Sequence, residues 1–239
     1  MNKTKTAVIA ASFLCCSHSF AQETDEPEWD VNNPPGESRE ISIDTRNGTW
    51  MSLDISPDGE TIVFDLLGDI YTLPVDGGRA TSINGGLAWS MQPRFSPDGS
   101  EIAFTSDAGG GDNVWIMQAD GSNARQLTKE DFRLLNHPYG SPDGTFIAAR
   151  KHFTPTRSLG TGEIWLYHRN GGGGVPVVEK PSEGHQKELG EPAFSPDGRY
   201  IYFSVDSTPG STFVYAQDTN GQVFEIRRHD LDTGKTESF

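Results

Sequence analysis

Ser56-Pro57-Asp58-Gly59 is a turn sequence that this chain contains four times, and the repeat decides its fold. The other copies begin at Ser96, Ser141 and Ser195, so by subtraction successive copies lie 40, 45 and 54 residues apart. Proline presets the backbone at the second position of a turn, aspartate bonds to nearby backbone, and glycine takes the conformation that closes a hairpin. Each copy therefore predicts a tight turn between two strands.

A strand of alternating apolar residues is expected after each turn. Isoleucine stands three residues past each turn glycine, and phenylalanine stands five residues past it in three of the four copies. Side chains two residues apart lie on the same face of a strand, so this face is predicted to point toward a core. The residues concerned are Ile62, Ile102, Ile147 and Ile201, with Phe64, Phe104 and Phe203.

A further strand and a second turn complete each repeat. The strands are expected at residues 70–73, 114–117, 164–167 and 223–228, and each ends near an Asp or Asn followed by Gly, as in Asp76-Gly77. With one strand before the first turn and one after the second, each repeat has four antiparallel strands. Units of this size and make-up are typical of β-propeller blades. We therefore expect an all-β propeller that forms an incomplete ring, with four blades at about 47–83, 87–128, 135–180 and 188–239.

Three prolines support the assignment of the first strand in each blade. Pro93, Pro138 and Pro192 stand three residues before their turn serine, and Leu53 takes this place in the first repeat. Proline cannot donate a hydrogen bond to a sheet and is confined to edge strands and bulges. The first strand of a blade is such an edge because it lines the central channel.

These motifs resemble the TolB-like propeller repeat of exported bacterial proteins over residues 49–239. A closer resemblance, carried by residues 48–51, 64–71, 93–96 and 157–165, is to the amino-terminal propeller of large exported amidohydrolases. In those proteins more blades and a metal-dependent hydrolase domain follow. The resemblance therefore implies a propeller portion of a periplasmic hydrolase whose catalytic domain is absent from this chain.

The first 21 residues have the layout of a secretory signal. Lys3 and Lys5 precede a short apolar core, and Ser19-Phe20-Ala21 form a small-residue cleavage site, so we expect the mature chain to begin near Gln22. The apolar run is roughly ten residues, well below the about 20 that span a bilayer. We expect a periplasmic or secreted protein that does not span the membrane.

The chain is strongly acidic. Its formal net charge is −15, and removal of the two signal lysines makes it −17 by subtraction. Because phosphate binding relies on lysine and arginine, we expect no nucleic-acid partner. Residues 22–46 are predicted to be an acidic, flexible leader. Within it, Ile41 and Ile43 alternate with polar residues and could supply a strand that closes the ring.

The sequence contains no recognisable catalytic motif. The six histidines are scattered, with no His-x-His and no His-Glu-x-x-His, and there is no Gly-x-Ser-x-Gly or Gly-x-Gly-x-x-Gly. We therefore expect no catalytic residue, metal ligand or cofactor site within these residues. Whether the parent protein is an enzyme is left open.

Two connections between second and third strands are unusually long, at residues 151–162 and 206–221. Loops of this length are uncommon unless they bind something. They carry basic and aromatic residues, which we expect to form a surface that binds a partner domain or ligand: Arg150, Lys151, His152, Phe153, Arg157, Phe213 and Tyr215. The alternative is that the two loops pack on each other. The predicted function is a non-catalytic docking module, with the amidohydrolase propeller as the second interpretation.

Overall fold

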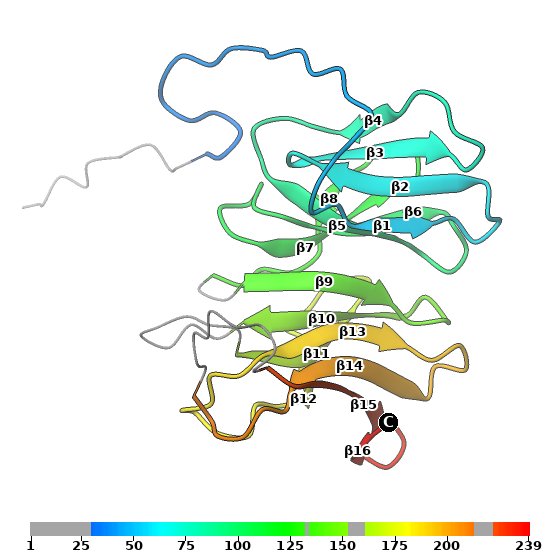
Figure 1. Ribbon diagram of the computed structural model, residues 1–239. Coiled ribbons are helices and arrows are strands. Elements are labelled where there is room, and N and C mark those ends of the chain that lie inside the picture. The colour runs from blue at the N-terminus through cyan, green and yellow to red at the C-terminus, as the bar shows by residue number, and fades with distance from the viewer. Residues whose placement is uncertain (1–29, 132–133, 153–160, 213–221) are drawn as a thin grey trace, which may run out of the picture.

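The computed structural model describes residues 30–131, 134–152, 161–212 and 222–239, and these form four antiparallel sheets of four strands each (Figure 1). The described residues contain no helix. The first blade holds β1 (Leu53–Ile55), β2 (Thr61–Leu66), β3 (Asp69–Pro74) and β4 (Thr81–Asn84); the second holds β5 (Ser90–Phe95), β6 (Glu101–Ser106), β7 (Asn113–Gln118) and β8 (Arg125–Gln126). The third holds β9 (Leu134–Gly140), β10 (Phe146–His152), β11 (Gly162–His168) and β12 (Val175–Val178); the fourth holds β13 (Leu189–Phe194), β14 (Tyr200–Asp206), β15 (Phe224–Asp230) and β16 (Thr236–Ser238). The predicted four-bladed, all-β architecture is confirmed.

The four turns that begin with Ser-Pro-Asp-Gly share one hydrogen-bond network. In the first copy the Ser56 hydroxyl donates to Oδ1 of Asp58 at 2.5 Å and accepts from the Thr61 amide at 2.9 Å. The same two bonds recur in the other three copies. The turn glycines have φ between +70° and +77°, a region that side chains with a Cβ rarely adopt. All four copies of the repeat therefore form the same hydrogen-bonded turn.

The second, third and fourth blades each bury one face against the blade before them. Ile102 and Phe104 lie in a cluster with Val63 and Ile70 of the first blade. Two further clusters join the second blade to the third and the third to the fourth. In these three blades the isoleucine of the repeat, and the phenylalanine where there is one, point toward the preceding blade, as their two-residue spacing predicts. The expectation is wrong for the first blade: no described blade precedes it, so Ile62 and Phe64 are only partly buried, and Val63 on the opposite strand face packs against the second blade.

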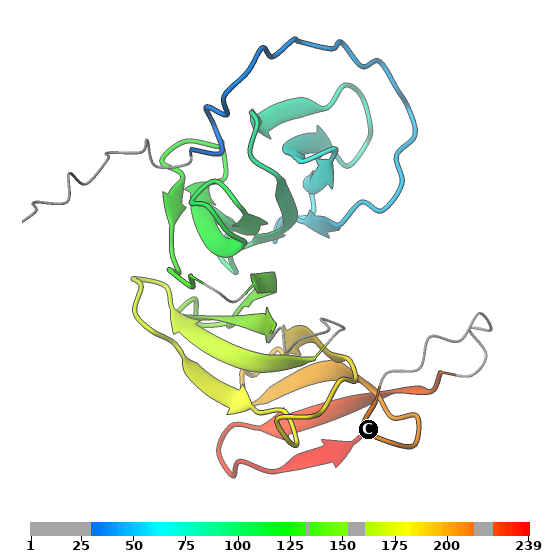
Figure 2. The same cartoon turned by 90° about the vertical axis from the view of Figure 1, so that its left-hand side faces the viewer.

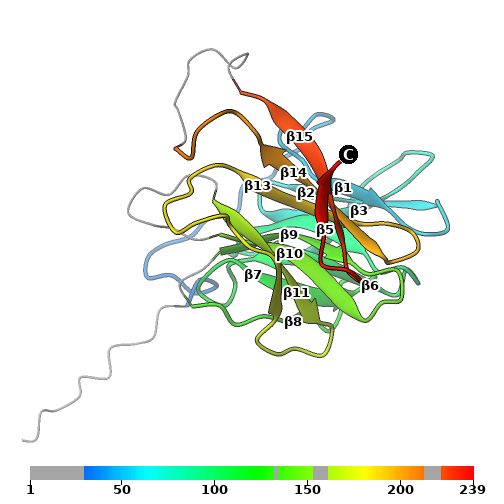
Figure 3. The ribbon, with the colours of Figure 1, turned by 90° about the horizontal axis from the view of Figure 1, so that it is seen from below.

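The blades follow an open arc, which confirms the predicted incomplete ring (Figure 2). Figure 3 looks onto the fourth blade, whose outer face no other described blade covers. Tyr202 and Phe239 pack edge to face on this blade at 5.5 Å, and Ile226 is 48% exposed. Ile41 and Ile43 are exposed and residues 40–45 form no strand, so they do not close the ring.

The inner strands carry a β-bulge at each of the three prolines. The register of β5 on β6, β9 on β10 and β13 on β14 shifts at the step that contains Pro93, Pro138 or Pro192. Gln92, His137 and Glu191, the residues before these prolines, have φ of 57°, 52° and 57°. Left-handed backbone is costly for residues other than glycine. Because this conformation recurs at the same position in three blades, we infer that it has the same structural role in each.

Candidate functional site

The arc has two different faces. The Ser-Pro-Asp-Gly turns lie along one edge, on the right in Figure 1, and we call this the turn face. The connections between second and third strands and the links between blades lie along the opposite edge, which we call the loop face. Strand β10 runs from the turn face to the loop face and ends there at His152.

The residues expected to bind a partner fall into two groups. Phe153, Arg157, Phe213 and Tyr215 lie outside the described residues. Arg150 and Lys151 are 3% and 7% exposed, and His152 is half-buried. The expected basic surface is therefore not formed by Arg150 and Lys151, because each is withdrawn into an interface between blades.

Arg150 joins the third blade to the fourth. Its Nη1 forms an ion pair with Oε1 of Glu188 at 2.9 Å. A Cβ at Gly190 would come within 2.3 Å of the Arg150 Cδ, and a Cβ at Gly162 within 2.8 Å of its Nε. The two glycines therefore provide the space in which the arginine side chain crosses from β10 to β13.

Lys151 joins the third blade to the second. Its Nζ lies 2.8 Å from Oε1 of Glu130 and 3.8 Å from the centroid of the Trp165 ring. The Tyr167 hydroxyl donates to the same Glu130 oxygen at 3.0 Å. Burial, and then the nearby Glu130 carboxylate, raise the pKa of Tyr167, so its hydroxyl stays a donor.

A chain of hydrogen bonds runs along the channel wall from the second blade to the third. Gln92 Nε2 lies 3.0 Å from His137 Nε2, His137 Nδ1 lies 3.3 Å from Asn136 Oδ1, and Asn136 Nδ2 lies 2.9 Å from His152 Nε2. An amide nitrogen only donates, so each histidine accepts at Nε2 and is neutral. Burial, and then the charge of Arg150, lower the pKa of both histidines to about 4.

The bulge residues bind backbone as well as one another. Oδ2 of Asp65 accepts from the Gln92 amide at 2.6 Å, and Oε1 of Gln92 accepts from the His137 amide at 2.8 Å. Glu191 continues the row, with Oε1 3.8 Å from His137 Nε2. This row of side chains was not predicted from the sequence. The available signal was a polar residue directly before each strand proline.

An exposed apolar cluster lies at the loop face beside the first two blades. Leu67, Leu87 and Trp89 are 62%, 53% and 53% exposed. Trp89 packs against Gly68, where an added Cβ would lie 2.9 Å from the indole ring. The Trp89 amide donates to Oδ1 of Asp107 at 2.7 Å, which fixes the link that carries it. Hydrophobic residues in a glycine-rich link were the only sequence signal for this cluster.

Within the described part of the chain, no group of three or more His, Cys, Asp or Glu side chains could hold a metal ion. The same residues include no helix that is long and apolar enough to cross a membrane.

A family model for the TolB beta propeller domain matches residues 23–163, which is more than half of the chain. This chain belongs to the TolB β-propeller family. Among curated proteins, this TolB-type chain is 32% identical to the uncharacterized peptidase YuxL of Bacillus subtilis over 54% of its own length and 24% of that protein. It is 29% identical to the uncharacterized protein Atu1656 of Agrobacterium fabrum, over 63% of its own length and 54% of that protein.

Solved structures show the same fold. A putative TolB from Agrobacterium tumefaciens superposes with a TM-score of 0.60 at 20% identity, covering 78% of this chain and 60% of that one. A puromycin hydrolase gives 0.56 at 15% identity, covering 80% and 28%. The TolB-type chain thus spans less than two thirds of these relatives. They include peptidases, and they do not show the closer resemblance to amidohydrolases.

Proposed function

We propose that this chain is an exported, non-catalytic propeller module that binds a partner protein domain through its loop face. The observation that carries the proposal is the exposed cluster of Leu67, Leu87 and Trp89. Exposed apolar patches on soluble proteins mark interaction sites, and tryptophan is enriched among residues that dominate binding energy. Export rests on the signal-like first 21 residues.

The buried ion pairs give this face a fixed frame. Arg150 and Lys151 tie the loop-face end of β10 to the blades on either side through Glu188 and Glu130. Binding residues are commonly found on loops that a rigid scaffold carries, and the end of β10 is such a scaffold. In this proposal Phe153, Arg157, Phe213 and Tyr215, which lie on the two long connections, complete the partner surface.

The partner we favour is a hydrolase domain. The peptidase YuxL and the puromycin hydrolase are both several times longer than the region that this chain matches, because the match covers only 24% of YuxL and 28% of the puromycin hydrolase. A second candidate is the metal-dependent domain of an amidohydrolase, which the stretches at residues 48–51 and 157–165 favour. A His-x-His motif in coding sequence that follows Phe239 would select the second, and a Gly-x-Ser-x-Gly motif there would select a serine peptidase.

Site-specific photocrosslinking in the organism that makes the protein tests the proposal. A photoreactive amino acid is placed at exposed loop-face positions and, as matched controls, at exposed turn-face positions. The loop-face positions are Leu87, Lys129 and Ser182, and the controls are Asp58, Asp98 and Asp143. We expect one protein species to be crosslinked from the loop face only. Crosslinking of that species from the turn face would contradict the proposal, and so would an absence of crosslinks from both faces.

A further inference from the structure

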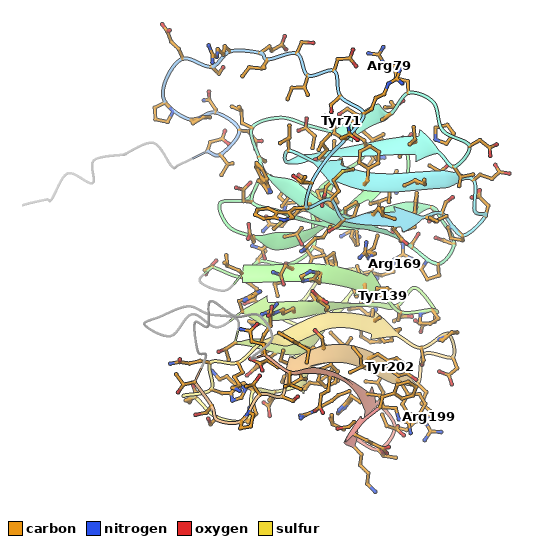
Figure 4. The ribbon with its side chains drawn as sticks, viewed as in Figure 1. Tyr71, Arg79, Tyr139, Arg169, Arg199 and Tyr202 are labelled. Atoms are coloured by element: carbon orange, nitrogen blue, oxygen red, sulfur yellow. The ribbon has the colours of Figure 1, made fainter. Side chains whose placement is uncertain are left out.

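A cavity of about 280 Å³ opens in the channel wall near the turn face, away from the proposed docking surface. It is lined by the inner strands of all four blades, among them Asp54, Arg94, Tyr139 and Phe194. Arg94 and Tyr139 hold equivalent positions, two residues before the turn serine of their blades. Figure 4 shows Tyr139 near the turn-face end of β9.

We propose that Arg94 and Tyr139 form a binding site for a carboxylate that carries an apolar group, such as the C-terminus of a peptide that ends in an aromatic residue. Nη1 of Arg94 donates to the carbonyl oxygens of Leu53 at 2.8 Å and Pro93 at 3.0 Å. These two bonds fix the guanidinium plane at the junction of the first two blades. Its Nε and Nη2 have no hydrogen-bond partner among the described residues.

Arg94 differs from the other channel cations in lacking an acidic partner. Arg150 and Lys151 are each paired with a glutamate, whereas no carboxylate of the described residues forms an ion pair with Arg94. Arginine presents parallel N–H groups that match a carboxylate, so the two unused nitrogens suit this ligand group.

Tyr139 supplies a second donor on the next blade. Tyr139 is 36% exposed, and its hydroxyl forms no hydrogen bond with a described residue. A phenol that lines the same cavity as a guanidinium can donate to the same carboxylate from another direction. Two donors on separate blades would therefore fix the orientation of the ligand.

The remaining wall selects what is attached to the carboxylate. Phe95, Phe194 and Ile55 line the cavity together with the turn prolines. The volume lies at the small end of ligand pockets, which suits one aromatic residue rather than an extended ligand. Asp54 also lines the wall, where its Oδ2 accepts from the Phe95 amide at 2.9 Å. This negative charge disfavours any anion, but it disfavours doubly charged phosphate more than a singly charged carboxylate.

Binding of N-acetylphenylalanine and of acetyl-Gly-Gly-Phe, each compared with its C-terminal amide, tests the site by titration calorimetry or NMR. We expect both acids to bind at least about tenfold more tightly than their amides, as a charged hydrogen bond requires. Tighter binding of the tripeptide acid would identify a peptide C-terminus as the ligand, and equal binding would identify a small carboxylic acid. If the amides bind as well as the acids, the proposal is wrong.

Matched variants assign the effect to the two side chains. Arg94→Gln should weaken binding of the acids by about 10- to 100-fold, whereas Arg79→Gln, an equal charge change on an exposed arginine in the β3–β4 turn, should leave it unchanged. Tyr139→Phe removes only the hydroxyl and should weaken binding by about 2- to 10-fold without altering thermal unfolding. Equal effects of Arg94→Gln and Arg79→Gln, or no effect of Tyr139→Phe, would overturn the assignment.

Discussion

The backbone amide of His137 donates to the side-chain oxygen of Gln92 at 2.8 Å, although the two residues lie in consecutive blades. Both stand directly before a proline at a β-bulge. A bulge leaves a backbone N–H without a partner in its own sheet, and a buried unpaired N–H is costly. The side chain of the preceding blade satisfies this N–H, so the bulge joins one blade to the next.

Replacing Gln92 with leucine should lower the free energy of unfolding by about 1–3 kcal/mol, because the His137 amide loses its acceptor in a partly buried place. Urea unfolding measures the change. Gln118→Leu is the matched control, since Gln118 Nε2 contacts only Oε1 of Glu101, at 3.5 Å. A loss of equal size in both variants would show that the acceptor role of Gln92 is not what matters.

The left-handed backbone at Glu191 predicts an unusual response to glycine. This residue has φ of 57°, so the Glu191→Gly variant should be more stable than Glu191→Ala by about 1 kcal/mol. Two residues further on, Ala193→Gly should be destabilising by about 0.5–1 kcal/mol, the ordinary cost of glycine in a strand. Chemical denaturation of the three variants checks both signs. A lower stability for glycine than for alanine at residue 191 would contradict the assigned strain.

The two neutral histidines of the channel predict a loss of stability in mild acid. The pKa of His137 and of His152 is about 4 in the folded chain, below the ordinary value of 6.5. Between these two pH values the unfolded chain binds more protons than the folded one, so this contribution is complete above pH 6.5 and declines as the pH falls toward 4. We expect each histidine to lower the free energy of unfolding by roughly 1–2 kcal/mol at pH 5 relative to pH 7.5.

Unfolding of His137→Asn in urea at both pH values tests this dependence. The variant should lose less stability than the parent chain between pH 7.5 and pH 5, and His168→Gln, at an exposed residue, should behave like the parent. An unchanged pH dependence in His137→Asn would mean that this histidine does not cause it.

Lys151 should be essential for stability rather than available for binding. Lys151→Ala leaves Glu130 in a partly buried place without its cation, and the expected loss is about 3–5 kcal/mol. Lys129→Ala, at an exposed lysine in the same region, should change stability by less than about 0.5 kcal/mol. Thermal and urea unfolding measure both. A small effect of Lys151→Ala would indicate that its charge is not held between the blades.

The fold was predictable because its signals are local. Each Ser-Pro-Asp-Gly turn is held by hydrogen bonds between its own residues and the strand that follows. The two-residue spacing of the isoleucine and phenylalanine in that strand indicates that they lie on the same face. The environment of the long connections was not predictable in this way. Arg150 and Lys151 pair with glutamates 38 and 21 residues away, and these partners meet only when blades pack.

The candidate site was predictable only in its location. Connection length pointed to the loop face, but the exposed cluster of Leu67, Leu87 and Trp89 comes from a turn and a blade link that looked unremarkable in sequence. Whether an apolar side chain is buried depends on what folds over it. For the same reason, the alternation of Ile41 and Ile43 suggested a strand that the structure does not form.

The affinity of the crosslinked partner for a Trp89→Ala variant is the most direct test of the docking proposal. Trp89 is the largest side chain of the exposed cluster and packs on Gly68, next to Leu67, so its loss should weaken binding by at least about tenfold, as for other interface tryptophans. Val75→Ala, at a residue 48% exposed on the turn face, should bind within about twofold of the parent chain. Unchanged binding by Trp89→Ala, or an equal loss in both variants, would contradict the docking of a partner through the loop face.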